Sequence, residues 1–162
     1  SNFYKAETAK EQLREVSRIS DDAVIDSVEV PEFGAVLIYS TTLGGTLHKV
    51  LSESVLKLDG NKSKPLPEMY YMLKEVLNLS EYNRILASYM DGVLYLVVAQ
   101  GKTLLLCNSF KAPDFTTAQY FIFMVLKKLQ LNPEMSTISF RTPLTEEQEM
   151  SLYRYFKSVD VL

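Results

Sequence analysis

The sequence is poor in the side chains that build compact chemical sites. One cysteine and one histidine among 162 residues exclude a disulfide scaffold and a His/Cys zinc site. Six glycines are few for several phosphate-binding loops. The formal net charge of −3 leaves no basic surface for nucleic acid or an anionic membrane. The longest apolar run, residues 120–126, is far shorter than the roughly 20 residues that insertion into a membrane requires.

The composition that remains is that of a soluble globular protein, with 47% hydrophobic and 23% charged residues. This length allows one domain, or one domain plus part of another. The lone Cys107 and the lack of a signal-peptide pattern favour a cytoplasmic protein. Ser1-Asn2 is typical of a remnant of tag cleavage, so we expect a part of something longer.

The first half of the chain alternates helical and strand patterns. The expected elements are a surface helix over 7–19, strands over 23–30 and 35–39, a helix over 47–58 and a helix from Pro67. The continuous apolar run of the second strand predicts burial on both faces. Residues 59–64 carry no apolar side chain and predict a linker. The helix from Pro67 is expected to bury a stripe of Met69, Tyr70, Leu73, Val76 and Leu77.

The second half begins with three short strands, predicted over 84–90, 93–100 and 103–110. Asp91-Gly92 separates the first two, and both central residues of a type I′ hairpin turn need a positive φ. A turn around Gly101 separates the next two. The pattern therefore predicts an antiparallel meander whose middle strand, almost wholly apolar, is covered on both faces.

A helix over 115–131 follows and is apolar almost all round, which predicts burial in the core with Phe121 and Val125 facing the sheet. Asn132-Pro133 is expected to stop it. A strand over 137–140, a helix and a last strand over 159–162 complete the chain. Thr145 and Gln148 predict a capping box at the start of that helix. Its expected inner face is Met150, Leu152, Tyr153 and Phe156.

The element order from residue 84 is β-β-β-α-β-α-β, which predicts an α/β fold with a mixed sheet and helices on both faces. That is the order of the ribonuclease-H-like domain, of which actin-like ATPases carry two copies. We therefore expect a partial first subdomain over 1–58, a linker and connecting helix over 59–83, and a ribonuclease-H-like second subdomain over 84–162.

Three segments resemble a known family. The stretch 91–110 has two strands joined by a Gly-Lys turn and ends in Asn-Ser-Phe, and Leu-Gln-Leu-Asn-Pro-Glu follows at 129–134. Upstream, Pro-Glu-Phe-Gly-Ala-Val lies at 31–36. The chain resembles an uncharacterised bacterial family, the domain of unknown function 3822, described with an actin-like ATPase fold. The resemblance implies that fold, and that this chain is the C-terminal two thirds of the family pattern.

The resemblance also implies where an actin-like nucleotide site would lie. The phosphate turn corresponds to residues 88–93, where Ser88 stands at the position of the usual metal-orienting Asp, and where Asp91 and Gly92 form the turn. The adenosine turn corresponds to 139–144, which contains Thr142 but no glycine. Bound ATP with magnesium would therefore use Ser88, Asp91, Gly92 and Thr142. From the residues themselves, Asp91-Gly92 indicates a tight hairpin turn.

Other candidate residues lack partners in the sequence. Gly44-Gly45-Thr46 precedes a predicted helix but lacks the spacing of a phosphate loop. His48 and Cys107 have no Ser, Asp or His neighbour that would indicate a hydrolase. No catalytic residue, cofactor or metal site is therefore assigned from the sequence.

Several tyrosines cannot all face inward, among them the pairs at 70–71 and 153–155. Some must cover another surface, namely a missing N-terminal subdomain, a second copy or a partner protein. The leading hypothesis is a non-enzymatic scaffold or protein-interaction module. The alternative is an ATP-binding protein resembling pilus-assembly proteins of the ATPase fold, with the nucleotide held between two subdomains.

Overall fold

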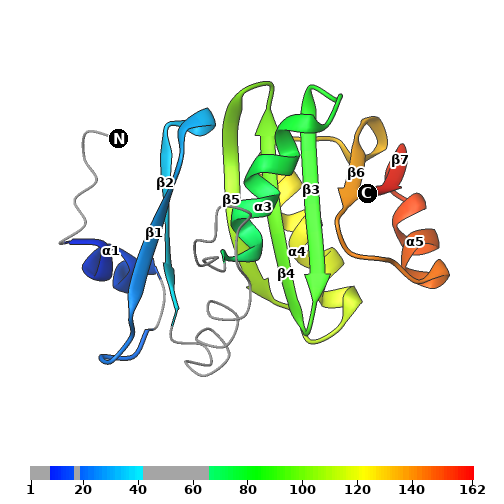
Figure 1. The fold of residues 1–162 in the computed structure, drawn as a ribbon. Helices are drawn as coiled ribbons and strands as arrows, with labels where there is room; N and C mark the ends of the chain where they lie inside the picture. The colour runs from blue at the N-terminus through cyan, green and yellow to red at the C-terminus, as the bar shows by residue number, and fades with distance from the viewer. Residues whose placement is uncertain (1–7, 17–18, 42–65) are drawn as a thin grey trace, which may run out of the picture. The chain divides into compact units, whose positions relative to one another are not determined.

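The computed structural model describes residues 8–16, 19–41 and 66–162 (Figure 1). The chain divides into two compact units, residues 1–70 and 71–162, which are described in turn. The boundary falls within α3 (Glu68–Glu75).

Two of the elements predicted for the first half of the chain cannot be compared with the structure. The predicted helix over 47–58 and the predicted linker over 59–64 lie outside the described residues. The division into 1–58, 59–83 and 84–162 stays a prediction.

The first unit contains α1 (Ala9–Val16), β1 (Ile25–Val30) and β2 (Ala35–Ser40). The two strands form an antiparallel ribbon in which Ile25 pairs with Ser40 and Val30 with Ala35. Gly34, at φ 58°, returns the chain between them in a conformation that favours glycine. Every residue of β2 is half-buried, so the prediction that it is buried on both faces is wrong. Among the described residues, its apolar run pairs with β1 alone, in a two-stranded ribbon.

The second unit is built on a five-stranded sheet with the order β5-β4-β3-β6-β7. Its strands are β3 (Asn83–Met90), β4 (Val93–Gln100), β5 (Thr103–Lys111), β6 (Thr137–Phe140) and β7 (Ser158–Val161). The first three pair antiparallel, while β6 pairs parallel with β3 and β7 parallel with β6. The predicted meander, the later strands and the mixed sheet are confirmed.

Turn chemistry explains the meander. Asp91 at φ 52° and Gly92 at φ 72° form the two-residue turn between β3 and β4, as the Asp-Gly pair predicts. Burial on both faces of β4 is also confirmed. Its residues Leu94, Leu96 and Val98 join the core beneath α4, while Val97 on the opposite face is fully buried as well.

Helices cover the two faces of this sheet, α3 on one and α4 (Phe115–Lys128) on the other (Figure 1). The buried stripe of α3 and the short 3₁₀ turn that follows it is Met69, Met72, Leu73 and Val76. The sequence pattern missed Met72, whereas the predicted Tyr70 and Leu77 are only half-buried.

Both ends of α4 are fixed by hydrogen bonds. The Asp114 carboxylate accepts from the backbone N–H of Thr117 at 2.7 Å, and this bond lowers the pKa of Asp114 below its usual range. At the other end, the N–H of Leu131 donates to the carbonyl of Leu126 at 2.9 Å, and Gln130 lies at φ 57°. This is a Schellman motif, so α4 ends at Lys128 rather than at residue 131.

The prediction that α4 is buried all round is wrong. Ile122 is fully buried, but Tyr120 is 63% exposed and Met124 is 39% exposed. Phe121 is half-buried and stacks on Phe110 of the edge strand β5, with ring centroids 4.8 Å apart. Val125 is buried as predicted. The helix therefore covers the sheet with one face and turns an apolar face outward.

The last helix, α5 (Glu146–Tyr153), starts with the predicted capping box. The N–H of Thr145 donates to the Gln148 side chain at 2.9 Å, and the Thr145 hydroxyl accepts from the Gln148 N–H at 3.3 Å. Its inner face contains Leu152, with Phe156 buried just beyond the helix. The predicted inward positions of Met150 and Tyr153 are wrong, because both side chains are exposed.

Candidate functional site

The carboxyl ends of β3 and β6 carry all four residues that the sequence singles out. Ser88 lies near the end of β3, and Asp91 and Gly92 form the turn beyond it. Thr142 lies just after β6, which runs parallel to β3, so it reaches the same end of the sheet. The structure therefore brings the four residues to one edge, but it gives them very different surroundings.

The Asp91-Gly92 turn is tight, and hydrogen bonds join it and its flanking residues to the neighbouring strands. Met90 and Val93 flank it as paired residues. The carbonyl of Gly92 accepts from the N–H of Ala112 at 2.8 Å, which ties the turn to the end of β5. A Cβ on Gly92 would meet only ordinary contacts, 3.7 Å from the Ala112 carbonyl oxygen. Glycine is therefore required here by the positive φ rather than by close approach of another group.

Thr142 is also engaged within the fold. Its hydroxyl oxygen accepts from the backbone N–H of Tyr89 at 2.9 Å, and the neighbouring Arg141 N–H donates to the carbonyl of Ala87 at 2.9 Å. These bonds extend the β3–β6 pairing beyond the last residue of β6. The Thr142 hydroxyl thus binds the segment after β6 to the end of β3.

Tyr89 closes this end of the sheet from the α4 side. Its hydroxyl donates to the carbonyl of Ala112 at 3.1 Å, and its ring meets Phe115 edge-on with centroids 5.5 Å apart. A large side chain in a turn that cradled phosphate would obstruct the approach of a ligand. Here it joins the first turn of α4 to the end of β3.

Ser88 is the exception among the four. It is fully buried, and its hydroxyl has no hydrogen-bond partner among the residues that the structure describes. A buried hydroxyl without a partner costs free energy, so it marks a position where the fold has left a polar group unused. Asp91, by contrast, is exposed at the tip of the turn.

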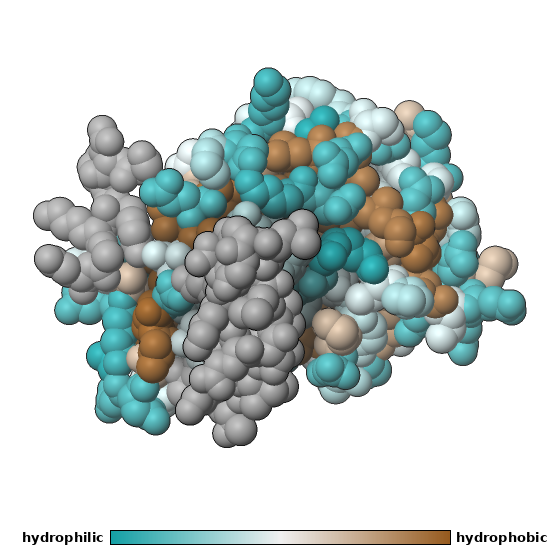
Figure 2. Space-filling view, viewed as in Figure 1, coloured by the Kyte–Doolittle hydropathy of each residue, from teal (hydrophilic) through white to brown (hydrophobic). Residues whose placement is uncertain are grey.

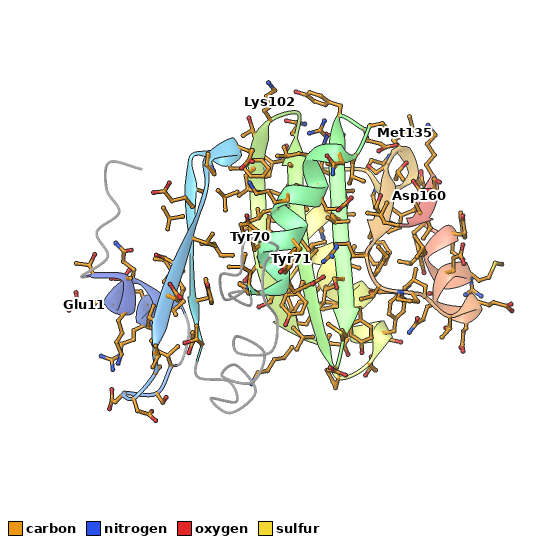
Figure 3. The ribbon with its side chains drawn as sticks, viewed as in Figure 1. Glu11, Tyr70, Tyr71, Lys102, Met135 and Asp160 are labelled. Carbon is orange, nitrogen blue, oxygen red and sulfur yellow. The ribbon has the colours of Figure 1, made fainter. Side chains whose placement is uncertain are left out.

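Sequence reasoning missed the cation at this edge. The Arg141 guanidinium lies over the ring of Tyr71 on α3, 5.8 Å from the ring centroid. Figure 3 labels Tyr71, which is 44% exposed. An arginine directly after a strand at the carboxyl edge of a sheet was the available signal, since ligands of open α/β sheets bind there.

The four residues provide few groups that could bind a triphosphate. Within the described residues, the four positions supply one engaged hydroxyl, one buried hydroxyl, one carboxylate and a single glycine. In the same part of the chain, no group of three or more His, Cys, Asp or Glu side chains is placed to hold a metal ion. Two polar pockets lie elsewhere, one of about 250 Å³ beside Phe115 and Ser151 and one of about 220 Å³ beside Tyr82 and Lys157.

The remaining candidates do not add a site. His48 and Gly44-Gly45-Thr46 lie outside the described residues. Cys107 is half-buried on β5, and desolvation raises the pKa of its thiol to about 11. A thiol with so high a pKa carries almost no thiolate at neutral pH, which argues against a nucleophile. None of the helices in the described ranges is sufficiently long and apolar to cross a bilayer.

The strand order, the mixed pairing and the β-α-β alternation after the meander are those of a ribonuclease-H-like sheet of the actin-like ATPase fold. A family model described as "Protein of unknown function (DUF3822)" matches residues 1–159, and the chain belongs to that family.

Comparison with solved structures supports the same class. A crystal structure from Bacteroides thetaiotaomicron, of a protein with an actin-like ATPase fold and unknown function, is similar with a TM-score of 0.76 and 16% identity. The similarity covers 99% of this chain and 62% of that protein, and at this identity it shows the fold alone. No curated protein matches the chain.

Proposed function

We propose that this chain is a non-enzymatic scaffold or protein-interaction module built on an actin-like ATPase fold. The observation that carries the proposal is the use of the β3–β4 end for internal bonding. The Thr142 hydroxyl is bound to Tyr89, and the Gly92 carbonyl to Ala112. Groups that would have to meet a phosphate hold strands together instead.

Exposed apolar side chains support an interaction role. Among the described residues of the second unit, Tyr82, Tyr120, Met135 and Met150 are each more than 60% exposed. Hydrophobic residues also reach the surface shown in Figure 2, among hydrophilic ones, in the region of β6, β7 and α5. Large exposed apolar side chains that gather on one face mark surfaces for other proteins.

The proposed partners follow from the family pattern. This chain spans 62% of its structural neighbour, and the first partner we propose is a further N-terminal subdomain. A second copy of this chain or another protein is the next partner that we propose. We place the module in the cytoplasm of a bacterium, as the lone cysteine and the family resemblance suggest.

One observation favours an alternative. Within the described part of the chain, the buried Ser88 hydroxyl has no hydrogen-bond partner, and Arg141 lies at the same sheet edge. An ATP-binding protein resembling pilus-assembly ATPase-fold proteins would use such groups, with the nucleotide held between two subdomains. The described residues do not fit magnesium-ATP well, because the turn has two residues and its carbonyl is engaged.

Thermal unfolding with excess magnesium-ATP tests the proposal. A ligand at 100 times its dissociation constant stabilises a protein by about 2.7 kcal/mol, which is easily seen as a rise in Tm. We expect no rise for this chain. A rise that Gly92→Val abolishes, with magnesium alone as the control, would show a working phosphate turn and replace the scaffold proposal by the alternative.

A further inference from the structure

A polar pocket of about 220 Å³ lies at the amino ends of β3, β6 and β7, which run parallel to one another. We call it the amino-edge pocket, because the four candidate nucleotide residues lie at the opposite edge of the same sheet. Its lining includes Glu81, Tyr82, Asn83, Met135, Ser136 and Lys157. Met135, labelled in Figure 3, lies just before the start of β6.

Hydrogen bonds hold the β6–β7 side of the amino-edge pocket in place. The backbone N–H of Lys157 donates to the carbonyl of Ser136 at 3.1 Å, which joins the segment before β7 to the segment before β6. Ser136 is buried, and its hydroxyl donates to the carbonyl of Asn132 at 2.7 Å. This wall of the pocket therefore exists without a ligand.

The β3 side of the pocket is fixed by the β4–β5 hairpin. The Arg84 guanidinium donates to the carbonyls of Glu81 and Gly101 at 3.1 and 2.9 Å. The N–H of Gly101 donates to the carbonyl of Tyr82 at 2.9 Å, and a Cβ on Gly101 would lie only 3.3 Å from the Tyr82 ring. These bonds use the backbone carbonyls of Glu81 and Tyr82 rather than their side chains.

Two opposite charges border the pocket without meeting. Glu81 is half-buried on one side, and Lys157 is exposed on the other. Among the residues that the structure describes, neither the Glu81 carboxylate nor the Lys157 ammonium group makes an ion pair or a hydrogen bond. A ligand that carries both charges at once would provide each group with a counter-charge.

Two exposed apolar side chains stand beside these charges. Tyr82 is 69% exposed and Met135 is 75% exposed, and both border the pocket. An apolar group placed between the ring and the thioether would remove apolar surface from water on both sides. The pocket is smaller than the roughly 300–1,000 Å³ of sites for drug-sized molecules, so it suits a smaller ligand.

We propose that the amino-edge pocket binds a free α-amino acid with an apolar side chain. The α-ammonium group binds the Glu81 carboxylate, the α-carboxylate binds the Lys157 ammonium group, and the side chain lies between Tyr82 and Met135. Because both ion pairs lie near solvent, each adds little, and the expected dissociation constant is about 0.1–1 mM. This inference goes beyond the proposed interaction role and does not depend on it.

Titration of L-leucine and L-phenylalanine into the 162-residue chain, followed through backbone amide chemical shifts, tests the proposal. The shifts should move most at Tyr82, Thr137 and Lys157. N-acetyl-leucine lacks the ammonium charge and leucinamide lacks the carboxylate, so each should bind about three- to tenfold more weakly than leucine.

Two results of this titration would overturn the proposal. One is the absence of shift changes at these residues with either amino acid at about 20 mM, well above the expected dissociation constant. The other is a derivative that binds as tightly as leucine. Tight binding of leucinamide or of N-acetyl-leucine would point to one end of a peptide chain instead of a free amino acid.

Charge-removing variants locate the binding site. Glu81→Gln and Lys157→Gln should each weaken leucine binding about three- to tenfold. Glu146→Gln and Lys111→Gln are the matched controls, because these exposed residues lose the same charges at the opposite edge of the sheet. The controls should leave the dissociation constant unchanged. Unaltered binding by both pocket variants, or equal weakening by the controls, would contradict the proposal. Magnesium-ATP titration of the same samples tests the proposed function separately.

Discussion

Ile122 and Phe121 are neighbours on α4 whose side chains lie in different surroundings. Ile122 is fully buried among core residues, whereas Phe121 is half-buried at the sheet edge and stacks on Phe110. Ile122→Ala should cost about 2–5 kcal/mol, from lost transfer free energy and a cavity. Phe121→Ala should cost less than Ile122→Ala, because part of its ring already meets solvent.

Urea denaturation of the two variants measures this difference directly. The sequence pattern alone favours Phe121 as the larger loss, since it places that residue against the sheet. Equal losses, or a larger loss for Phe121→Ala, would mean that the edge stacking with Phe110 is part of the main core.

Cys107 provides a test of burial on β5. Desolvation raises the pKa of its thiol to about 11, so the folded protein keeps the proton between pH 9 and 11 while the unfolded chain releases it. The free energy of unfolding should therefore fall as the pH rises through that window. At pH 8 the native thiol should react with Ellman's reagent about 100-fold more slowly than in denaturant. Equal rates would show an accessible thiol.

At the scale of elements, the C-terminus of α4 holds a residue under local strain. Gln130 adopts φ 57° at the position of the Schellman motif where glycine is preferred. Gln130→Gly should therefore stabilise the protein by about 0.5–1 kcal/mol, since the left-handed conformation costs a side chain more than glycine loses in entropy. Thermal unfolding should show a Tm higher by about 2–4 °C.

Gln119→Gly is not a useful comparison, because Gln119 is half-buried and its side chain bonds Ser151. Lys128→Gly serves instead, since Lys128 is exposed and helical. That variant should lose about 1 kcal/mol. A loss at Gln130→Gly as well would mean that the glutamine side chain stabilises the turn more than its backbone strains it.

Local chemistry determined which elements could be predicted. The strands β3 to β5 follow from alternation and two-residue turns, and the α5 start follows from Thr145 and Gln148, because these signals lie within a few residues. The outward face of α4 could not be predicted from an apolar sequence. Hydrophobicity alone does not say which of Tyr120 and Ile122 meets the sheet; that depends on where α5 lies.

The candidate site shows the same limit. Its four residues lie at one edge of the sheet because β3 and β6 pair parallel and end there; their role in binding ATP stays a prediction. The hydrogen bond between Thr142 and Tyr89 was not predictable, because the two residues are far apart in sequence and meet only through the β3–β6 pairing. The contact of Arg141 with Tyr71 likewise depends on how α3 packs.

On the scale of the whole molecule, the second unit keeps the sheet of an ATPase-like fold while its two sides differ. The β3–β4 end forms hydrogen bonds between its own strands, and the helices α4 and α5 expose apolar side chains, among them Tyr120 and Met150. The groups at the position of a nucleotide site form hydrogen bonds within the fold, and apolar side chains face outward. A surface of this kind is suited to binding proteins. The central claim is therefore the absence of a functional nucleotide site at the β3–β4 end.

Calorimetric titration of magnesium-ATP into the protein tests that claim most directly. The account predicts heats of dilution only, for the unaltered protein and for Arg141→Ala alike. A dissociation constant in the micromolar range, about −8 kcal/mol, that is weakened by Arg141→Ala would contradict it.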